Sequence, residues 1–438
     1  MQFRLSALSP LGQSLVRNAG AMFSGNMTSS VLGLLSVMAA ARTLEPKLFG
    51  VLTLIVTYAT VMDRLLNFQS WTAVVRFGAS ARERGKQEEM LAVVKLCISA
   101  DIATACLGTV IAIGVAPLVA GHFEWTERDV IFVQIYALTI ATNIVGVTTG
   151  LLQLERDFKL LARLNVLGAI LKAAFSLLGF AGDFGLPYFV ISWLIADLLK
   201  NSSLLYVGIT LLQRLGLLGF WRGDTRQVEG GRRRALKFLL VTNLVASLKM
   251  SIRELDVLLV GAILDPRGAG IYKIAKQFGS TLSKPVDPVN VVIYPEFASL
   301  SASGDDKRFW RLFARVTIAT TVIATVMLIL LAIVAKPLIT HTVGSEYLAA
   351  VPVVILYATG VHIAISTIAF YPALTALGYE NRSLLAISVG TAIYFWALYL
   401  LTLNYGLLGA GGSYFVFYIV WSVIMSLSLR AARVGGRR

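Results

Sequence analysis

The sequence predicts an all-α protein that crosses a membrane many times. Of its 438 residues, 57% are hydrophobic and only 14% are charged, whereas a soluble globular domain has about 25% charged residues. Its mean hydropathy is +0.75. Apolar runs of about 20 residues, the length that crosses a bilayer core as a helix, recur along the chain. Composition therefore excludes an ordinary soluble protein.

Twelve such runs are bounded by charged residues or by Gly and Pro. We predict a membrane-spanning helix over each of residues 19–41, 49–66, 91–119, 130–152, 164–181, 186–212, 238–264, 268–294, 312–339, 349–377, 384–403 and 407–429. The small residues at 39–41 are typical of a signal-peptide cleavage site, but the apolar run before them is too long for one. The first span is therefore predicted to be retained.

The charge of the loops predicts the orientation. The chain carries a net charge of +15, but its basic residues are scattered over short loops without a binding module, which argues against nucleic acid as a partner. With the N-terminus on the cytoplasmic side, 24 Lys and Arg fall inside and 5 fall outside. Short cytoplasmic loops carry such an excess. Both termini are predicted to be cytoplasmic.

The longest polar connection, residues 213–237, carries the Arg232-Arg233-Arg234 run. It is predicted to be a basic cytoplasmic linker between an N-terminal six-helix lobe, 1–212, and a C-terminal six-helix lobe, 238–438. Its charges are interpreted as topology control, with binding of anionic lipid headgroups as the alternative.

An internal repeat relates the two lobes. The turn Leu44-Glu45-Pro46-Lys47, followed by Gly50, recurs 220 residues later as Leu264-Asp265-Pro266-Arg267, followed by Gly270. Pro ends the outgoing helix and Gly permits close packing at the start of the next one. Because each lobe starts on the cytoplasmic side, the repeats are predicted to be parallel. The turn is interpreted as scaffold.

Six charged residues stand out between positions 249 and 276. Lys249, Arg253 and Asp256 share one face of the seventh span, and Lys273, Lys276 and Gln277 share one face of the eighth, with Glu254 off the main face. Counting inward from the outer turn places Asp256 and Lys276 each ~12 Å deep, so Asp256 can pair with Lys276 or Lys273. Four bases against two acids leave a surplus of positive charge, which predicts an anion site for Lys249, Arg253, Lys273, Lys276 and Gln277.

Weaker candidates lie elsewhere. Asn26 is predicted to face a cavity, and Asp63 and Arg64 to act in substrate access or coupling, with snorkelling as the alternative for the last two. Asp101, Lys172, Asp197 and Lys200 are interpreted as buried pairs or boundary residues, with a coupling proton on Asp101 or Asp197 as the alternative. Pro285 and Pro288 predict a kinked eighth span that acts as a hinge, whereas the second span lacks these prolines.

No catalytic pattern is present. His122, His341 and His362 are far apart, Cys97 and Cys106 have no metal spacing, and no phosphate-binding loop or nucleophile motif occurs. The sequence predicts neither an enzyme nor a metal or cofactor.

The second span exits through Val75-Arg76-Phe77-Gly78-Ala79, and the eighth through Tyr294-Pro295-Glu296-Phe297-Ala298. Together with the two repeated turns, these exits resemble the polysaccharide transporter branch of the multidrug/oligosaccharidyl-lipid/polysaccharide (MOP) exporter superfamily. The loops 154–158 and 376–382 are similar to that family as well. The resemblance implies two V-shaped bundles, a central cavity lined by spans one, two, seven and eight, and alternating access.

It also implies a function. The expected substrate is an undecaprenyl-pyrophosphate-linked oligosaccharide, flipped across the bacterial inner membrane for polysaccharide biosynthesis. Partners would be membrane lipids, a coupling ion (H⁺ or Na⁺), a polysaccharide polymerase and glycosyltransferases. The alternative is a multidrug or small-molecule cation antiporter of the same superfamily, which should favour acidic cavity residues over basic ones.

Overall fold

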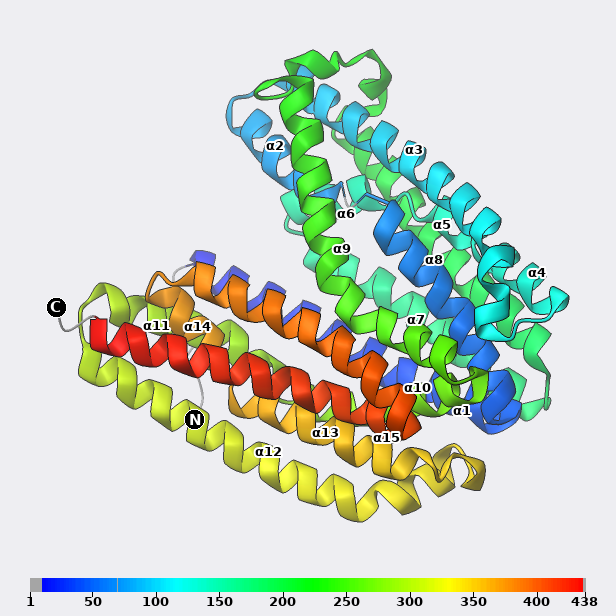
Figure 1. Cartoon of the computed structure of the whole chain (residues 1–438). Coiled ribbons are helices and arrows are strands. Elements are labelled where there is room, and N and C mark those ends of the chain that lie inside the picture. The colour runs from blue at the N-terminus through cyan, green and yellow to red at the C-terminus, as the bar shows by residue number, and fades with distance from the viewer. Residues whose placement is uncertain (1–9, 69, 436–438) are drawn as a thin grey trace. The chain divides into compact units, whose positions relative to one another are not determined.

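The computed structural model describes residues 10–68 and 70–435 (Figure 1), and this part of the chain is helical without strands. The side chains at 10–19, 21, 245–253, 287–288, 290–292 and 434–435 lie outside the description. The chain divides into two compact units. Unit 1 comprises Met1–Leu44 and Leu54–Leu255, and unit 2 comprises Glu45–Thr53 and Asp256–Arg438.

Unit 1 holds most of α1 and the helices that follow it. Their bounds are α1 (Pro10–Leu66), α2 (Trp71–Glu83), α3 (Gln87–Val119), η2 (Ala120–Phe123), α4 (Glu127–Tyr136), α5 (Leu138–Thr142), α6 (Gly146–Leu154), α7 (Phe158–Ala181), α8 (Leu186–Arg214), η3 (Leu218–Arg222), η4 (Thr225–Gln227) and α9 (Gly231–Ile263). Helix α2 packs against α3 and α6, α3 packs against α5, and α7 packs against α8.

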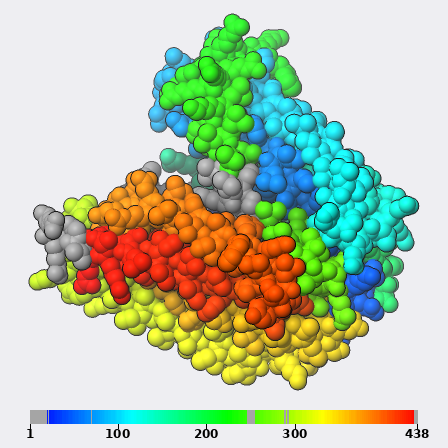
Figure 2. Space-filling model, in the orientation of Figure 1, coloured from blue at the N-terminus to red at the C-terminus, as the bar shows by residue number. Residues whose placement is uncertain are grey.

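Unit 2 is built around α13. Its elements are α10 (Pro266–Ser280), η5 (Thr281–Ser283), α11 (Asp287–Ala302), α12 (Asp306–Thr342), η6 (Ser345–Tyr347), α13 (Ala350–Ser366), α14 (Phe370–Ala376) and α15 (Glu380–Gly435). Helix α13 packs against α10, α12 and α15. Figure 2 shows α12, in yellow, along an outer edge of this unit, where Ile318, Val322 and Ile333 are exposed. Such a continuous apolar surface suits contact with lipid.

All twelve predicted spans overlap helices, and in the described residues the long apolar helices cover every span except the seventh and eighth. Spans one and two form α1, whose two helical stretches meet at Glu45, and spans eleven and twelve form α15, whose stretches meet at Gly406. In the described residues, eight helices, two of them these double ones, are long and apolar enough to cross a membrane. The protein is therefore an all-α polytopic membrane protein.

Acidic and hydroxyl side chains fix several helix starts, because the first N–H groups of a helix have no partner within it. Asp157 accepts from the backbone N–H of Leu160 at the start of α7, and Asp305 accepts from that of Arg308 at the start of α12. Thr126 and Asp129 form a reciprocal capping box at the start of α4.

Three of the predicted spans are interrupted. Span eight is broken over residues 281–286, between α10 and α11, as its prolines predict. Span four is interrupted between α5 and α6, and span ten between α13 and α14. Predicted span two is continuous and ends with α1 at Leu66. The kink expected in the eighth span is therefore confirmed, and the interruptions of spans four and ten were not predicted. At the break after α1, hydrogen bonds of the Asn67 side chain with Asp63 and Asn143 stabilise the chain without a proline.

The segment expected to link the two lobes packs on α3 inside unit 1. The Nζ atom of Lys95 donates to the carbonyl oxygens of Trp221 and Gly223, at 2.8 and 3.0 Å, and Phe220 and Val228 are buried. Farther along, a hydrogen bond with Ser80 and the nearby charge of Arg84 hold the pKa of Glu229 below its usual value.

The two copies of the repeated turn contact each other within unit 2. A Cβ atom added at Gly270 would lie 2.6 Å from the carbonyl oxygen of Pro46, and one added at Gly50 would overlap that of Pro266. Each glycine thus lets its helix approach the proline of the other copy. The backbones differ: Glu45 has a φ of 59°, whereas Asp265 is extended and its Oδ1 accepts from the N–H of Gly268.

Candidate functional site

Asp256 is the centre of a buried polar cluster in unit 2. Its carboxylate is 1% exposed and pairs with Lys276, whose Nζ lies 2.7 Å from Oδ1 and 2.8 Å from Oδ2. The hydroxyls of Tyr272 and Tyr394 donate to Oδ2 at 2.9 and 3.2 Å, and the backbone N–H of Val257 donates to Oδ1. The Asp256–Lys276 pair that helix depth predicted is present.

The cluster changes how the surplus of positive charge is counted. A buried carboxylate is tolerated when a cation and hydrogen-bond donors satisfy it, and Asp256 has both. The ammonium group of Lys276, which was expected to bind an anion, pairs with this carboxylate instead. Gln277, one residue on, is half-buried. Lys276 is therefore engaged by Asp256, and the anion site predicted for Lys249, Arg253 and Lys273 stays a prediction.

The remaining residues predicted for this site are only partly described. The side chains of Lys249, Arg253 and Pro288 lie outside the described residues. Lys273 and Glu254 are half-buried, and each has an interaction partner. Pro285 is exposed in the interruption before α11. Their assignment to an anion site and a hinge stays a prediction.

Asp63 lies in the last turn of α1 in unit 1, just before the break that separates α1 from α2. Asn67 Nδ2 donates to Asp63 Oδ1 and to the carbonyl oxygen of Asn143, both at 3.0 Å, and Asn143 Nδ2 donates to Asp63 Oδ2 at 2.8 Å. This network joins the break after α1 to the break after α5. Arg64 is half-buried beside it, and Asn26 is exposed on α1. The network satisfies both carboxylate oxygens of Asp63, and a part for Asp63 in coupling stays a prediction.

The peripheral charges divide into two cases. Lys172 pairs with Asp197 at 3.1 Å, and the hydroxyl of Tyr136 donates to Asp197 at 2.7 Å, so the expected ion pair is confirmed. Asp101 is 1% exposed and forms no ion pair with a described residue; the hydroxyl of Ser70 donates to it at 2.6 Å. The expectation of a pair or boundary position was wrong for Asp101.

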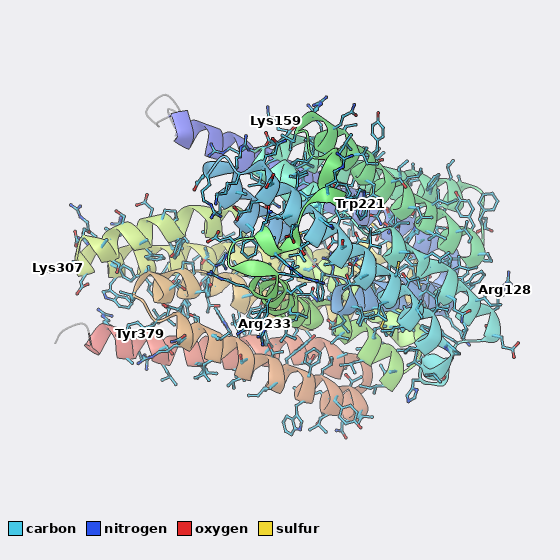
Figure 3. The ribbon with its side chains drawn as sticks, turned by 90° about the horizontal axis from the view of Figure 1, so that it is seen from above. Arg128, Lys159, Trp221, Arg233, Lys307 and Tyr379 are labelled. Carbon is cyan, nitrogen blue, oxygen red and sulfur yellow. The ribbon has the colours of Figure 1, made fainter. Side chains whose placement is uncertain are left out.

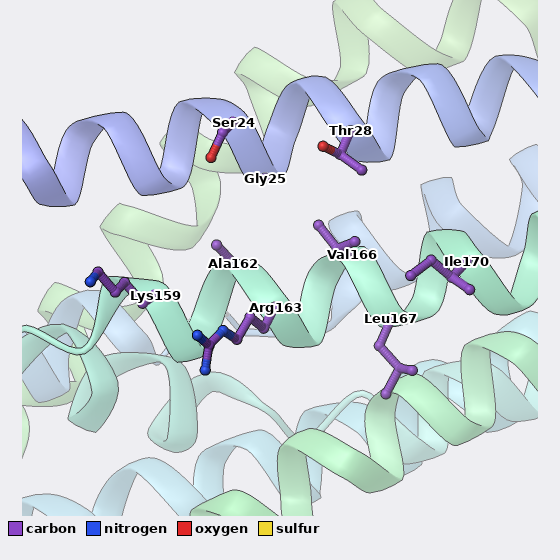
Figure 4. Close-up of a pocket in the computed structure, with 9 residues that line it drawn as sticks. All are labelled: Ser24, Gly25, Thr28, Lys159, Ala162, Arg163, Val166, Leu167 and Ile170. Carbon is purple, nitrogen blue, oxygen red and sulfur yellow. The ribbon is translucent and has the colours of Figure 1, made fainter.

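A groove between α1 and α7 in unit 1 was not foreseen from the sequence. It encloses about 560 Å³ and is lined by Ser24, Gly25, Thr28, Lys159, Ala162, Arg163, Val166, Leu167 and Ile170. In Figure 4, Ala162 and Val166 point toward α1, and Lys159 and Arg163 extend toward one end. The sequence interpretation assigned these two bases to topology alone, although they are spaced i, i+4 above apolar residues on one stripe.

The fold defines the class of protein. The structure resembles the lipid II flippase MurJ in an inward closed conformation, with a TM-score of 0.73 and 14% identity over 93% of this chain and 87% of that one. It also resembles a variant of the Vibrio cholerae MATE transporter VcmN, with a TM-score of 0.60 and 14% identity over 97% of each chain. The chain therefore has the fold that these two membrane transporters share.

Sequence comparison gives the family. The chain matches the polysaccharide biosynthesis protein family over residues 39–352 and belongs to it. It is also 26% identical over 342 residues to the Inner membrane protein YghQ of Escherichia coli K12, covering 77% of this chain and 95% of that protein. A transporter fold and a polysaccharide family thus coincide in one chain.

Proposed function

We propose that this protein flips an undecaprenyl-pyrophosphate-linked oligosaccharide from the cytoplasmic to the periplasmic leaflet of a bacterial inner membrane, by alternating access. The observation that carries the proposal is the family match over 39–352 in a chain that folds as a transporter. Both termini would be cytoplasmic. A coupling ion, H⁺ or Na⁺, would supply energy, and glycosyltransferases and a polymerase would act before and after the flip.

The pattern of charge favours this substrate over a cationic drug. Lys249 and Arg253 add positive charge at the depth of the predicted cavity, and a pyrophosphate needs cations, whereas a cationic drug needs acids. The acids Asp63 and Asp256 are both held in networks of hydrogen bonds. The multidrug antiporter of the same fold is the second candidate.

The first test measures transport directly. Purified protein in proteoliposomes should move a fluorescent undecaprenyl-pyrophosphate-linked oligosaccharide between leaflets, scored by access of a membrane-impermeant quencher. It should not expel ethidium from loaded vesicles. Ethidium export without flipping would support the antiporter and contradict the flippase.

The second test addresses the predicted anion site. The Lys249→Ala/Arg253→Ala variant should lose flipping by at least about tenfold, since charge-assisted contacts to phosphate are the strong ones. Lys276 is left unchanged, because its removal would strand Asp256. The control replaces Lys249 with Arg and Arg253 with Lys, which keeps both charges. Normal flipping by the alanine variant at equal protein level would contradict this site.

A further inference from the structure

The α1–α7 groove has separate polar and apolar ends. Six of its residues lie on α7 at positions 159, 162, 163, 166, 167 and 170, a single stripe along the helix. Lys159 and Arg163 occupy the end near the start of α7, and Ile170 lies at the other end (Figure 4). From Arg163 to Ile170 the helix rises about 10 Å. A ligand that fills the groove therefore has an anionic head and an apolar body.

Close contact between the helices sets the floor of the groove. A Cβ atom at Gly25 would lie 2.9 Å from that of Ala162, so the two helices nearly touch there. Thr28 lies on the α1 wall one turn from Ser24 and is exposed. The floor is thus made by two small residues, which leaves the volume above them open.

The two bases are available to a ligand. Lys159 and Arg163 are exposed, and in the described part of the chain neither forms an ion pair or hydrogen bond through its side chain. Side chains spaced i, i+4 lie ~6 Å apart on a helix, so two linked phosphates can contact both at once. A single phosphodiester offers only one phosphate to the pair.

We propose that this groove binds the pyrophosphate and the first part of the polyprenyl tail of the lipid carrier, with the phosphates on Lys159 and Arg163 and the tail along Val166 and Ile170. The inference rests on the proposed function and on its orientation, which places this end of α7 at the cytoplasmic headgroup level. The volume of about 560 Å³ suits this part of the lipid. The oligosaccharide would project from the groove, so the site recognises the carrier rather than the sugar.

Another helix offers a closely matched control. Lys307 and Arg311 have the same residue types, the same spacing and the same distance from the start of α12 as Lys159 and Arg163 have from the start of α7. Both are exposed, and neither lines the groove. Removing either pair changes the net charge equally.

The test is equilibrium binding of fluorescent undecaprenyl pyrophosphate, without sugar, to the full-length protein in phosphatidylcholine nanodiscs. The Lys159→Ala/Arg163→Ala variant should bind about tenfold more weakly, and Lys307→Ala/Arg311→Ala should stay within about twofold of the unmodified protein. Val166→Phe should also weaken binding, because the larger side chain would fill space that the polyprenyl tail occupies. Size-exclusion elution and the Tm of each variant report on folding.

Three results would overturn the inference. They are absence of binding by the unmodified protein, equal weakening by both alanine pairs, and displacement of the probe by phosphatidylglycerol as readily as by unlabelled undecaprenyl pyrophosphate, which would make the groove a general anionic-lipid site. If the groove variant flips the substrate and binds the probe normally, the groove proposal fails and the proposed function stands. If the probe binds in a groove-dependent way but the unmodified protein does not flip the substrate, the groove proposal stands and the proposed function fails.

Discussion

At the scale of single residues, the meaning of a charge depends on its partner. Lys276 lies in the most charged stretch of the sequence and has the residue type and depth expected of a pyrophosphate ligand. In the folded chain its ammonium contacts both oxygens of Asp256, and two tyrosine hydroxyls complete the carboxylate. Asp256 and Lys276 therefore form a structural ion pair inside unit 2.

This leads to a stability prediction. Lys276→Ala should lower the free energy of unfolding by about 3–5 kcal/mol, because it leaves a buried carboxylate without its cation. Asp256→Asn/Lys276→Met removes both charges at similar volume and should recover most of the loss. The measurement is the Tm of the purified protein in detergent. A double variant as unstable as Lys276→Ala would refute the pairing argument.

The same double variant separates structure from transport. If it is stable and still flips its substrate, Lys276 acts through Asp256 alone. If it is stable but inactive, the Asp256–Lys276 pair is needed for transport as well as for stability.

At the scale of elements, the repeated turn shows why a motif is duplicated. Gly50 and Gly270 each lie against the proline of the other copy, so the two turns form a reciprocal contact inside unit 2. A side chain at either glycine would displace backbone atoms, which shift less readily than the end of a side chain. The sequence predicted the role of close packing but not that the partner is the second copy.

Gly50→Ala should therefore destabilise the protein by about 1–3 kcal/mol, the usual effect of forcing a methyl group into a packed site. Gly33→Ala, in the same helix, is the control: nothing lies within 4 Å of its added Cβ, and alanine favours the helix by roughly 0.5–1 kcal/mol. Thermal unfolding in detergent measures both. Equal Tm values for the two variants would contradict the proposed contact.

At the scale of the whole molecule, the loops alternate as the predicted topology requires. Within unit 1, Arg128 and Lys159 lie at opposite ends, and within unit 2, Lys307 and Tyr379 lie at the same end (Figure 3). The spans predicted from hydropathy account for this alternation. Which end faces the cytoplasm follows from the Lys and Arg count alone.

Cysteine labelling tests that orientation. In a background with Cys97 and Cys106 replaced by Ser, His122→Cys should react with a membrane-impermeant maleimide added outside spheroplasts, and Lys86→Cys should react only after lysis. Both positions are exposed and lie at opposite ends of α3. The opposite labelling pattern would contradict the predicted orientation and the proposed direction of transport.

The sequence by itself determined the class, ten of the twelve spans and the repeat, because a span is a local property: about 20 apolar residues must satisfy their own backbone hydrogen bonds in lipid. Only the tertiary structure decided the partners. The break at Asn67 depends on Asn143, 76 residues away, Asp256 depends on Tyr394, 138 residues away, and the groove needs α7 beside α1. Such contacts are set by how helices pack, and hydropathy along the chain carries no record of which helix faces which.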